Sequence, residues 1–584
     1  MRSDGCDWSI SETHADAIFS GLRKFGEYPF FSFAFNGGSY FLQDPQSNLF
    51  SPVVPLTVLV GPTVALRLMT GVWGALGVYL FTSWMRRRVS VQAALLGGLA
   101  NVSSLGVLWR IAVGNDMFLW HLGLPGLLWS CEKLMRERTP ASVLWFGLAL
   151  GLMLLGPTYG SFVFLILPVM FLFVIAEWLA FRPNSRESAS IVGLGLVAFA
   201  IAALIASPKL ASWLTFSMTR PVEDYGPIPL REAVRNLLDF SIVKHHIVYA
   251  VPGLQETARG WGVEEAAVAL QPVAALLALV GVFSLVWRKA HRRLAIFGLL
   301  LITVGLFLSC SWTAFEIFRG LSNGGFRVVQ RFMAVSAFGL VLLATLGADA
   351  LFSRMGPSAW LATSLAGFLM LGSVAWWTHA AGSHGGTSHC DSVYPDAIDP
   401  IARFRDERDA TDDFRSYTRI RRFPGVGRDF LKGGGYSDGF LIVGNEFEPK
   451  KWSARHSLPI VAKGADDAGS VALTHLRVKI FDLKPGGKVA LRIRLPAFGW
   501  RISTIPTNAH VHVDAEGGMV AIENTGQEPI RRVVLRAKLP FSAAWFVVSG
   551  LSLATVLGAL VLLIWRKSRP RKHYLALQSG GNRG

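Results

Sequence analysis

Residues Leu56–Arg88 read LTVLVGPTVALRLMTGVWGALGVYLFTSWMRRR, an apolar run that ends in three consecutive arginines. About 20 apolar residues in a helix span the hydrocarbon core of a bilayer, and arginines collect where such a helix leaves the membrane. The run therefore predicts a membrane-spanning helix over 56–84 that ends in a basic surface loop.

Runs of the same kind recur along the chain. Of its 584 residues, 52% are hydrophobic and 16% are charged, whereas soluble domains carry about 25% charged residues. We therefore expect a polytopic α-helical membrane bundle rather than a soluble globular protein. The eleven expected spans lie near 56–84, 90–109, 117–131, 142–156, 158–181, 190–213, 266–287, 293–311, 328–353, 358–378 and 541–565.

The net charge of +18 is concentrated in short loops between these spans. Such basic loops indicate the cytoplasmic face of a membrane protein and attract anionic headgroups. No basic face with interleaved aromatic residues accompanies the charge, so membrane lipids are expected partners and nucleic acid is not. The basic loop and tail residues include Arg86, Arg87, Arg88, Lys133, Arg136, Arg138, Arg182, Arg186, Arg288, Lys289, Arg292, Arg293, Arg566, Lys567, Arg569, Arg571 and Lys572.

With the basic loops inside, three large segments face outward. In 379–540, short alternating apolar and polar runs are separated by PGG, EGG and NTG turns, which predicts an antiparallel β-sandwich. An external N-terminus normally follows an earlier span or a signal peptide, so we expect a first transmembrane helix to be missing; translocation of a short tail is the alternative. The expected division is an external region 1–55, a bundle 56–378 with an external loop 214–265, a β domain 379–540, a closing span 541–565 and a cytoplasmic tail 566–584.

Carboxylates in two external segments are candidates for acid–base chemistry. Asp7 lies in SDGCDWSISETHAD near the N-terminus, and Asp116 lies in RIAVGNDMFLWH between two spans. A carboxylate at the outer surface can take a proton from an attacking hydroxyl. The alternatives are an interfacial helix start for the first segment and an ordinary turn for the second.

Arginines and histidines of the external loops are candidates for ligand binding. Arg327 and Arg331 lie in SNGGFRVVQRF, one helical turn apart, and arginine binds phosphate through two parallel hydrogen bonds. Snorkelling toward headgroups is the alternative for this pair. His245 and His246 could contact a ligand or simply lie on the surface of the loop.

No metal site and no soluble cofactor are predicted, although a divalent cation is compatible with the carboxylates. The stretch THAAGSHGGTSHCD has side chains that suit zinc, but its spacing in a Gly/Ser-rich linker fixes no geometry. Those side chains are His379, His384, His389, Cys390 and Asp391.

The segment before the first span carries a further pattern. It contains Gly26-Glu27-Tyr28-Pro29-Phe30, Gly37-Gly38, Asp44-Pro45-Gln46 and Pro52. Together with the NGGFRVVQRF stretch and a C-terminal β domain followed by one helix, this pattern resembles the GT-C membrane glycosyltransferases, in particular the bacterial YfhO-type branch. The resemblance covers nearly the whole chain by architecture and about 60 residues by motif.

The resemblance implies transfer of a sugar from a polyprenyl-phosphate donor to an envelope glycan, lipid or protein, outside the cytoplasmic membrane of a bacterium. It implies Asp7 as the base and Asp116 as a second carboxylate that holds the acceptor or a metal. Arg327 and Arg331 would receive the donor phosphate. The residues expected around the substrate are Gly37, Gly38, Asp44, Gln46, His245 and His246.

Two other classes of function stay open. A transporter or flippase of lipid-linked sugars would require ionisable residues in mid-span and internal repeats. The sequence has few such ionisable residues and no internal repeats. A non-catalytic scaffold for envelope polysaccharide assembly would tolerate the loss of Asp7 and Asp116 but depend on the β domain. Substitution of each carboxylate distinguishes these classes from an enzyme.

Overall fold

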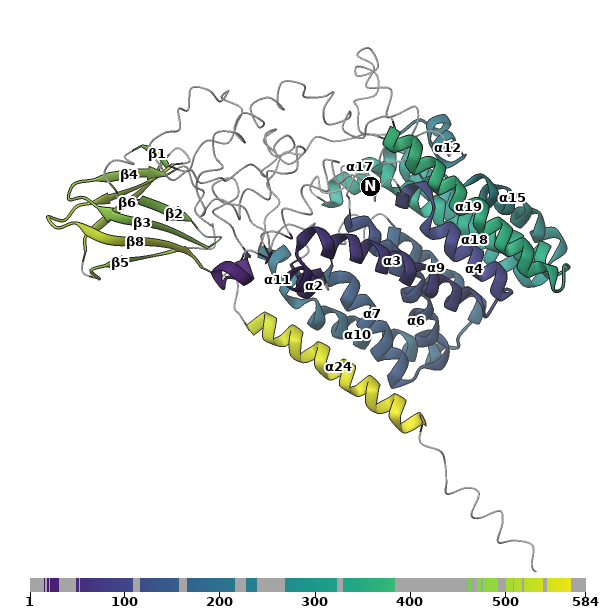
Figure 1. The fold of residues 1–584 in the computed structure, drawn as a ribbon. Helices are drawn as coiled ribbons and strands as arrows, with labels where there is room; N and C mark the ends of the chain where they lie inside the picture. The colour runs from purple at the N-terminus through teal and green to yellow at the C-terminus, as the bar shows by residue number, and fades with distance from the viewer. Residues whose placement is uncertain are drawn as a thin grey trace, which may run out of the picture.

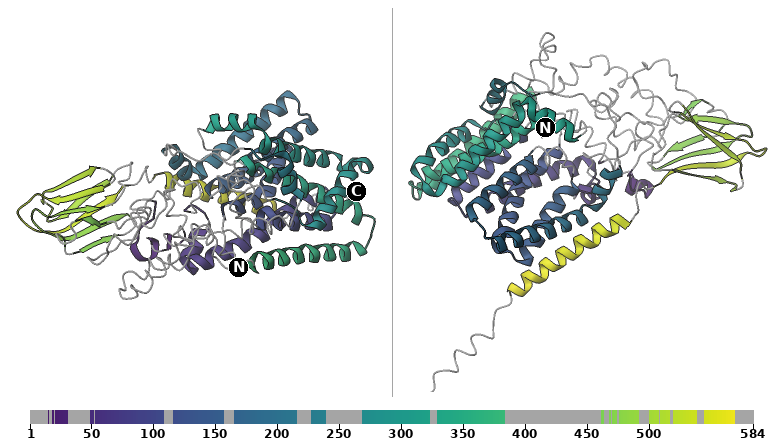
Figure 2. Two further views of the ribbon diagram at one scale, coloured as in Figure 1. Left: turned by 90° about the horizontal axis from the view of Figure 1, so that it is seen from above. Right: turned by 180° about the vertical axis from the view of Figure 1, so that it is seen from behind.

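The computed structural model describes a helical bundle and a smaller C-terminal sheet region (Figures 1 and 2). The described residues are 15, 18–19, 21–30, 49–51, 53–108, 116–156, 165–215, 227–238, 268–322, 329–383, 461–463, 468, 470–473, 476–491, 500–507, 509–516, 519–538 and 544–568.

The helices follow the apolar runs of the sequence. Each expected span contains a described helix. The helices are η1 (Gly21–Phe25), α2 (Val53–Val60), α3 (Pro62–Met85), α4 (Val91–Val102), η2 (Asp116–Gly123), α6 (Leu124–Glu137), α7 (Pro140–Leu155), α9 (Leu167–Phe181), α10 (Ser185–Ile205), α11 (Ser207–Thr215), α12 (Leu230–Leu238), α15 (Pro272–Trp287), η4 (Lys289–His291), α16 (Arg292–Cys310), α17 (Trp312–Ser322), η5 (Val329–Phe332), α18 (Met333–Phe352), α19 (Ser358–Ser383) and α24 (Ala544–Ser568).

Six of the described helices are long and apolar enough to cross a membrane, as judged by length and composition. They indicate a multi-pass membrane protein, which confirms the predicted class of fold. These candidate spans are Val64–Met85, Ser185–Ile205, Lys289–Cys310, Val329–Phe352, Ser358–Trp376 and Ala544–Trp565. The apolar helices α4, α7, α9 and α15 are shorter, so the predicted total of eleven spans stays a prediction.

Several expected spans differ in detail from the helices observed; the span 190–213, for example, consists of α10 and α11. The span 56–84 consists of α2 and α3, because Gly61 between them has a φ of 87°, which side-chain-bearing residues rarely adopt, and Pro62 follows. The segment around 117–131 is the 3-10 helix η2 followed by α6, and α6 continues to Glu137. This extension is stabilised by Glu132 and Arg136, whose charged atoms approach to 3.2 Å one turn apart.

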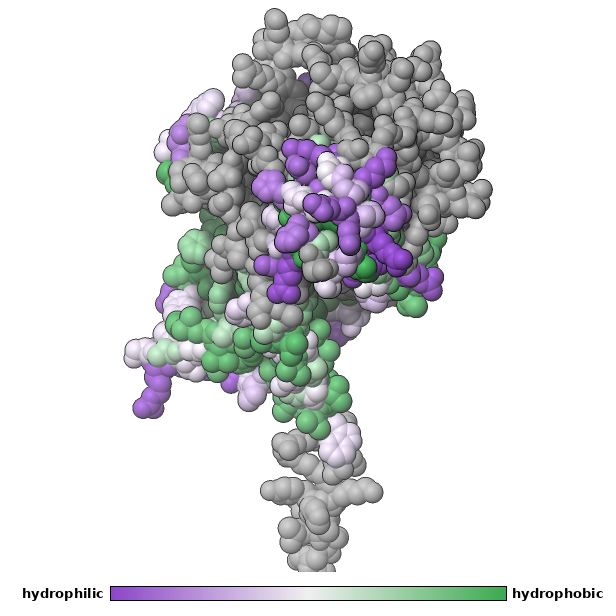
Figure 3. Space-filling model, turned by 90° about the vertical axis from the view of Figure 1, so that its left-hand side faces the viewer, coloured by the Kyte–Doolittle hydropathy of each residue, from purple (hydrophilic) through white to green (hydrophobic). Residues whose placement is uncertain are grey.

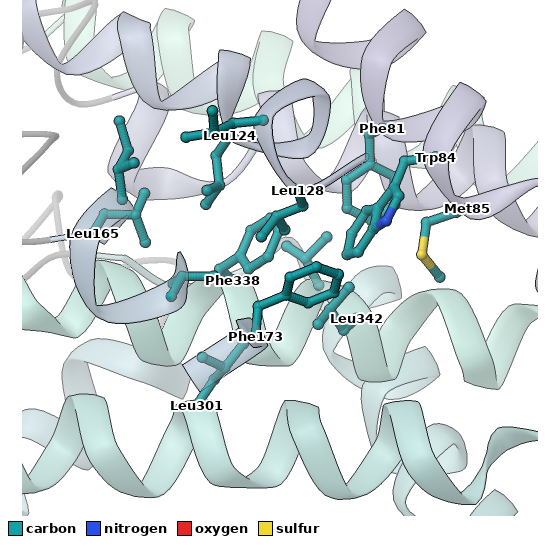
Figure 4. Close-up of a cluster of buried hydrophobic side chains, with 14 of the residues drawn as sticks. Phe81, Trp84, Met85, Leu124, Leu128, Leu165, Phe173, Leu301, Phe338 and Leu342 are labelled. Atoms are coloured by element: carbon teal, nitrogen blue, oxygen red, sulfur yellow. The ribbon is translucent and has the colours of Figure 1, made fainter. Parts of the chain in front are cut away.

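Helix α18 lies at the centre of the bundle. In its membrane-length window 83% of the residues are buried, against 11–33% in the other five candidate spans. Glycines bring α18 close to α15, since a Cβ on Gly347 would lie 1.8 Å from the Leu277 carbonyl oxygen. Small residues permit such backbone contact between membrane helices. On its other side, Phe338 of α18 stacks on Trp84 of α3 with ring centroids 6.4 Å apart (Figure 4).

The turns after α3, α6, α9, α15 and α18 lie at one end of the bundle, which we call the basic end. Contacts across the turns join them: Arg88 pairs with Glu132, Arg138 with Glu187, and Arg288 with Asp349. Asp349 also accepts a hydrogen bond from the Ser90 backbone N–H. The basic loops of the sequence therefore share one end of the bundle. The side of the membrane that this end faces stays a prediction.

Local sequence explains two of these turns. Arg138 and Arg182, with φ values of 50° and 47°, end α6 and α9 in the left-handed conformation. Thr139 and Asn184 then begin α7 and α10 with capping boxes, in which the cap side chain and the third helical residue bond each other's backbone N–H groups. Two successive helices can thus reverse direction within a few residues.

The sheet region contains two four-stranded antiparallel sheets, so the predicted antiparallel β structure is confirmed at this level. Apolar side chains of β3, β4, β7 and β8 form one buried cluster. The predicted PGG turn joins β3 to β4, and Gly486 has a φ of 69° there. The strand orders are β1-β4-β7-β6 and β2-β3-β8-β5. The strands are β1 (Val461–Lys463), β2 (Ser470–Leu473), β3 (Arg477–Leu483), β4 (Lys488–Leu491), β5 (Trp500–Ile505), β6 (Val511–Glu516), β7 (Met519–Asn524) and β8 (Ile530–Ala537).

Helix α24 leads from the sheet region back along the bundle. The Ser549 hydroxyl donates to the Ile205 carbonyl at 2.5 Å, and the Ser207 hydroxyl donates to the Trp545 carbonyl at 3.1 Å. The start of α24 therefore lies beside the end of α10, at the end of the bundle opposite the basic end; we call this the sheet end. Figure 3 shows a polar surface over the sheet region and an apolar surface over the helices below it.

Candidate functional site

The segment 21–30 lies against the sheet region. The Glu27 side chain is 3% exposed, and its Oε1 lies 3.0 Å from Nε of Arg477 in β3. Its Oε2 accepts a hydrogen bond of 3.1 Å from the Leu476 backbone N–H. Gly26, with a φ of 61°, turns the chain just before Glu27. The carboxylate is thus held by the positive charge of Arg477 and by one backbone donor.

Aromatic side chains continue this contact to α24. The Tyr28 hydroxyl donates a hydrogen bond to the Leu49 carbonyl, and burial raises the pKa of Tyr28 above its ordinary value. The Tyr28 and Phe546 rings pack edge to face with centroids 5.8 Å apart. Phe50 completes the group at 5.6 Å from Phe546. The first turn of α24 is therefore fixed to the segment that precedes α2.

Residues on both sides of 31–48 are buried in the same place. Phe30 is 5% exposed and Leu49 is 2% exposed, and both belong to the apolar cluster of β3 and β8. Phe30 and Leu49, which flank Gly37, Gly38, Asp44 and Gln46 in the sequence, therefore lie together at the junction of the sheet region, α2 and α24.

Most of the residues predicted for the site lie outside the described residues. Asp116 is the first residue of η2, but its side chain is outside the described part. Arg331 lies in η5, between the buried Gln330 and Phe332, directly before α18. The predicted meeting of Asp7 with Asp116 stays a prediction. The residues outside the described ranges are Asp7, Gly37, Gly38, Asp44, Gln46, His245, His246 and Arg327.

Buried polar side chains at the sheet end were not predicted. Lys209 of α11, Asn236 of α12 and Gln271 before α15 are all 0% exposed. Among the described residues, neither amide atom of Asn236 has a hydrogen-bond partner, so this side chain can both donate to and accept from a ligand hydroxyl. Lys209 fell inside the expected span 190–213, and its position as an ionisable residue within an apolar run is a signal that could have identified it.

Ion pairs at the basic end were also missed by the sequence analysis. Glu132 of α6 lies 2.5 Å from Arg88 and 3.2 Å from Arg136, and Glu177 of α9 lies 3.0 Å from Arg136. In the sequence, Glu132 follows the expected span 117–131 and Glu177 falls inside the expected span 158–181. In the structure, these carboxylates join the turn after α3 to α6 and α9.

Asp349 of α18 forms a second group of contacts at the basic end. Its carboxylate lies 2.9 Å from Nε2 of His291 and 3.3 Å from Arg288, and it accepts the Ser90 backbone N–H at 2.7 Å. Since every contact is to a residue of a turn, we assign Asp349 to the joining of three turns rather than to chemistry.

The described residues contain no group of three or more His, Cys, Asp or Glu side chains placed to hold a metal ion. Of the zinc-type side chains considered in the sequence, only His379 belongs to a described element, α19.

Comparisons with protein-family models, curated proteins and solved structures give no match. The class of the protein is therefore assigned from its fold alone. Its long apolar helices and its strands indicate a multi-pass membrane protein with an antiparallel sheet region at one end of its bundle.

Proposed function

We propose that this chain is a GT-C-type membrane glycosyltransferase that transfers a sugar from a polyprenyl-phosphate donor to an envelope glycan, lipid or protein. The observation that carries the proposal is the burial of Phe30 and Leu49 in one apolar cluster. These two residues flank the part of the sequence that holds the glycines, Asp44 and Gln46 of the resemblance. Flanking residues that are held in this way reduce the entropic cost of ordering the residues between them on a substrate.

The proposed arrangement has eleven spans, with the shorter helices α4, α7, α9, α15 and the η2–α6 pair added to the six long ones. The two sheets of the sheet region pack as a sandwich outside the membrane. The basic end faces the cytoplasm, as expected from its arginines. The sheet end then lies at the outer leaflet of a bacterial cytoplasmic membrane, where lipid-linked sugars are presented.

In the proposed reaction, the oxygen of the acceptor hydroxyl bonds to the anomeric carbon of the donor sugar. Asp7 takes the proton that this hydroxyl loses. The bond between that carbon and the phosphate oxygen breaks, and polyprenyl phosphate leaves with the bonding electrons. Arg327 and Arg331 stabilise the charge on the leaving phosphate. Asp116 orients the acceptor, and Asn236 and Lys209 are further polar groups at the same end.

The test is the glycan composition of the envelope, measured by mass spectrometry at matched membrane levels of each variant. Asp7→Asn should remove a sugar from one defined acceptor, as complete deletion does. Asp482→Asn is the matched control, because Asp482 is exposed on β3 and has a φ of 52°, a conformation that Asn tolerates. A normal glycan profile in Asp7→Asn would contradict Asp7 as the base and favour Asp116 in that role. A normal glycan profile after complete deletion would refute the enzymatic function and favour a scaffold.

A further inference from the structure

Two cations at the basic end approach the same aromatic ring. The Arg87 guanidinium carbon lies 5.5 Å from the centroid of the Trp129 ring, and Lys133 Nζ lies 4.8 Å from it. Arg87 follows α3, whereas Trp129 and Lys133 lie one turn apart on α6. Both positive charges thus contact the same ring, through the attraction of each to its electron-rich face.

The carboxylates nearby are already paired with other arginines. Glu132 and Glu177 contact Arg88 and Arg136. Within the described part of the chain, neither Arg87 nor Lys133 forms an ion pair, and Glu137, the next carboxylate of α6, pairs with neither. The charge of Arg87 and Lys133 therefore stays available to an anion from outside the chain.

An apolar surface leads along α3 toward these cations. Exposed side chains follow one another at spacings of three or four residues, so they share one face of the helix. The 15 steps from Val64 to Tyr79 cover about 22 Å at 1.5 Å per residue, more than the ~15 Å of one bilayer leaflet. The stripe consists of Val64 (50% exposed), Leu68 (48%), Val72 (53%), Leu76 (36%) and Tyr79 (66%).

Helix α6 runs beside the same part of α3. A Cβ on Gly126 would lie 3.1 Å from Cδ1 of Leu80, so the missing side chain allows close contact of the two helices. Gly126, Trp129 and Lys133 occupy one face of α6, and Arg87 comes two turns after Leu80. The cations therefore lie beyond the place where α3 and α6 touch, and Arg87 follows the last residue of the stripe, Tyr79, by eight residues, or about 12 Å along the helix.

We propose that an anionic phospholipid binds at this site, with its phosphate between Arg87 and Lys133 and an acyl chain that extends along α3 to the near end of the stripe, at Tyr79 and Leu76. Two adjacent cations without carboxylate partners favour a headgroup with net negative charge over a zwitterionic one. Exposed apolar side chains of membrane length favour a lipid over a soluble phosphate ester. The proposal does not depend on the enzymatic function.

The test is native mass spectrometry of the full chain from nanodiscs that contain phosphatidylglycerol and phosphatidylcholine in equal amounts. The variant Arg87→Gln/Lys133→Gln is compared with Arg292→Gln/Arg293→Gln, which removes the same charge from another exposed pair at the basic end. The intact chain and the control should keep one phosphatidylglycerol, whereas the Arg87/Lys133 variant should bind it at least tenfold more weakly. An equal loss in both variants, or no loss in either, would overturn the proposal.

A competition with the unaltered protein gives a second test that no folding defect can affect. Glycerol phosphate has the same charged group but no acyl chains. It should leave the bound phosphatidylglycerol in place at concentrations where short-chain phosphatidylglycerol displaces it. Equal displacement by glycerol phosphate would show that the α3 stripe has no part in binding.

Discussion

Glu27 Oε1 lies 3.0 Å from Nε of Arg477, which joins the segment before the first span to a strand that follows the bundle. The Glu27 side chain is 3% exposed and the Arg477 side chain is 35% exposed, so the pair extends from the interior to the surface. The sheet region is therefore attached to the bundle by this contact as well as by the covalent connection to α24.

Replacement of Glu27 by Gln should loosen the segment 21–30 from β3. The amide keeps the shape of the side chain but loses the charge-assisted contact to Arg477, which we expect to cost about 2–3 kcal/mol. Hydrogen exchange at the Leu476 amide, which donates to Glu27, measures the loss directly.

The matched control is Lys488→Gln on β4, in the other sheet. Its partner Glu523 lies 3.6 Å away, and the two side chains are 52% and 35% exposed, so its loss should cost less than about 1 kcal/mol. If Leu476 exchanged equally fast in both variants, the Glu27 contact would not hold the sheet region.

Tyr28 should titrate later than an ordinary tyrosine. Burial raises its pKa in the folded protein, whereas a detached segment would lose the proton near pH 10. Attachment of the segment should be constant below that pH and weaken as the pH rises above it, because only the detached state is then deprotonated. The difference in phenolate absorbance between the intact protein and Tyr28→Phe should have its midpoint above pH 10; a midpoint at or below pH 10 would contradict the burial.

Gly347→Ala should destabilise the bundle. The added Cβ would lie 1.8 Å from the Leu277 carbonyl oxygen, so α15 and α18 must separate, at a cost of about 3 kcal/mol. Gly372→Ala in α19 is the control, since nothing lies within 4 Å of its added Cβ and alanine favours a helix. Thermal unfolding in detergent should occur at a lower temperature for the first variant only; equal midpoints would disprove the close contact.

The sequence predicted the membrane helices because their signal is local. A run of apolar residues closed by arginines, as at Leu56–Arg88, needs no knowledge of distant residues. The alternating strands and the PGG turn at Gly486 were predictable for the same reason. The break at Gly61 was visible in the Gly-Pro pair, but the long apolar run around it outweighed that local signal.

The contacts of the candidate site were less predictable because their partners are distant in the chain. Nothing near Glu27 indicates that Leu476 and Arg477 will bind its carboxylate. In the same way, Asp349 belongs to an apolar run, and only the packing of α18 brings the Ser90 and His291 turns to it. The motif GEYPF was noted for its resemblance, whereas the structure gives its Glu and Tyr a role in attaching the sheet region.

The proposed orientation predicts opposite accessibility of the two ends. A cysteine at Lys289, in the turn after α15, should be protected from a membrane-impermeant maleimide in intact cells. A cysteine at the exposed Glu528, between β7 and β8, should react. The native cysteines are first replaced by serine. Reaction at position 289 with protection at position 528 would show that the membrane topology is the reverse of the one proposed. It would then contradict an active site on the outer face.

The most direct test of the proposed function is turnover by the purified chain in nanodiscs, with polyprenyl-phosphate sugars and envelope acceptors extracted from the source membranes. We predict that the intact protein and Asp482→Asn release polyprenyl phosphate and extend an acceptor by one sugar, whereas Asp7→Asn and Arg331→Ala do so at least a hundredfold more slowly. Failure of the intact protein to release polyprenyl phosphate from any donor in the extract would contradict the account.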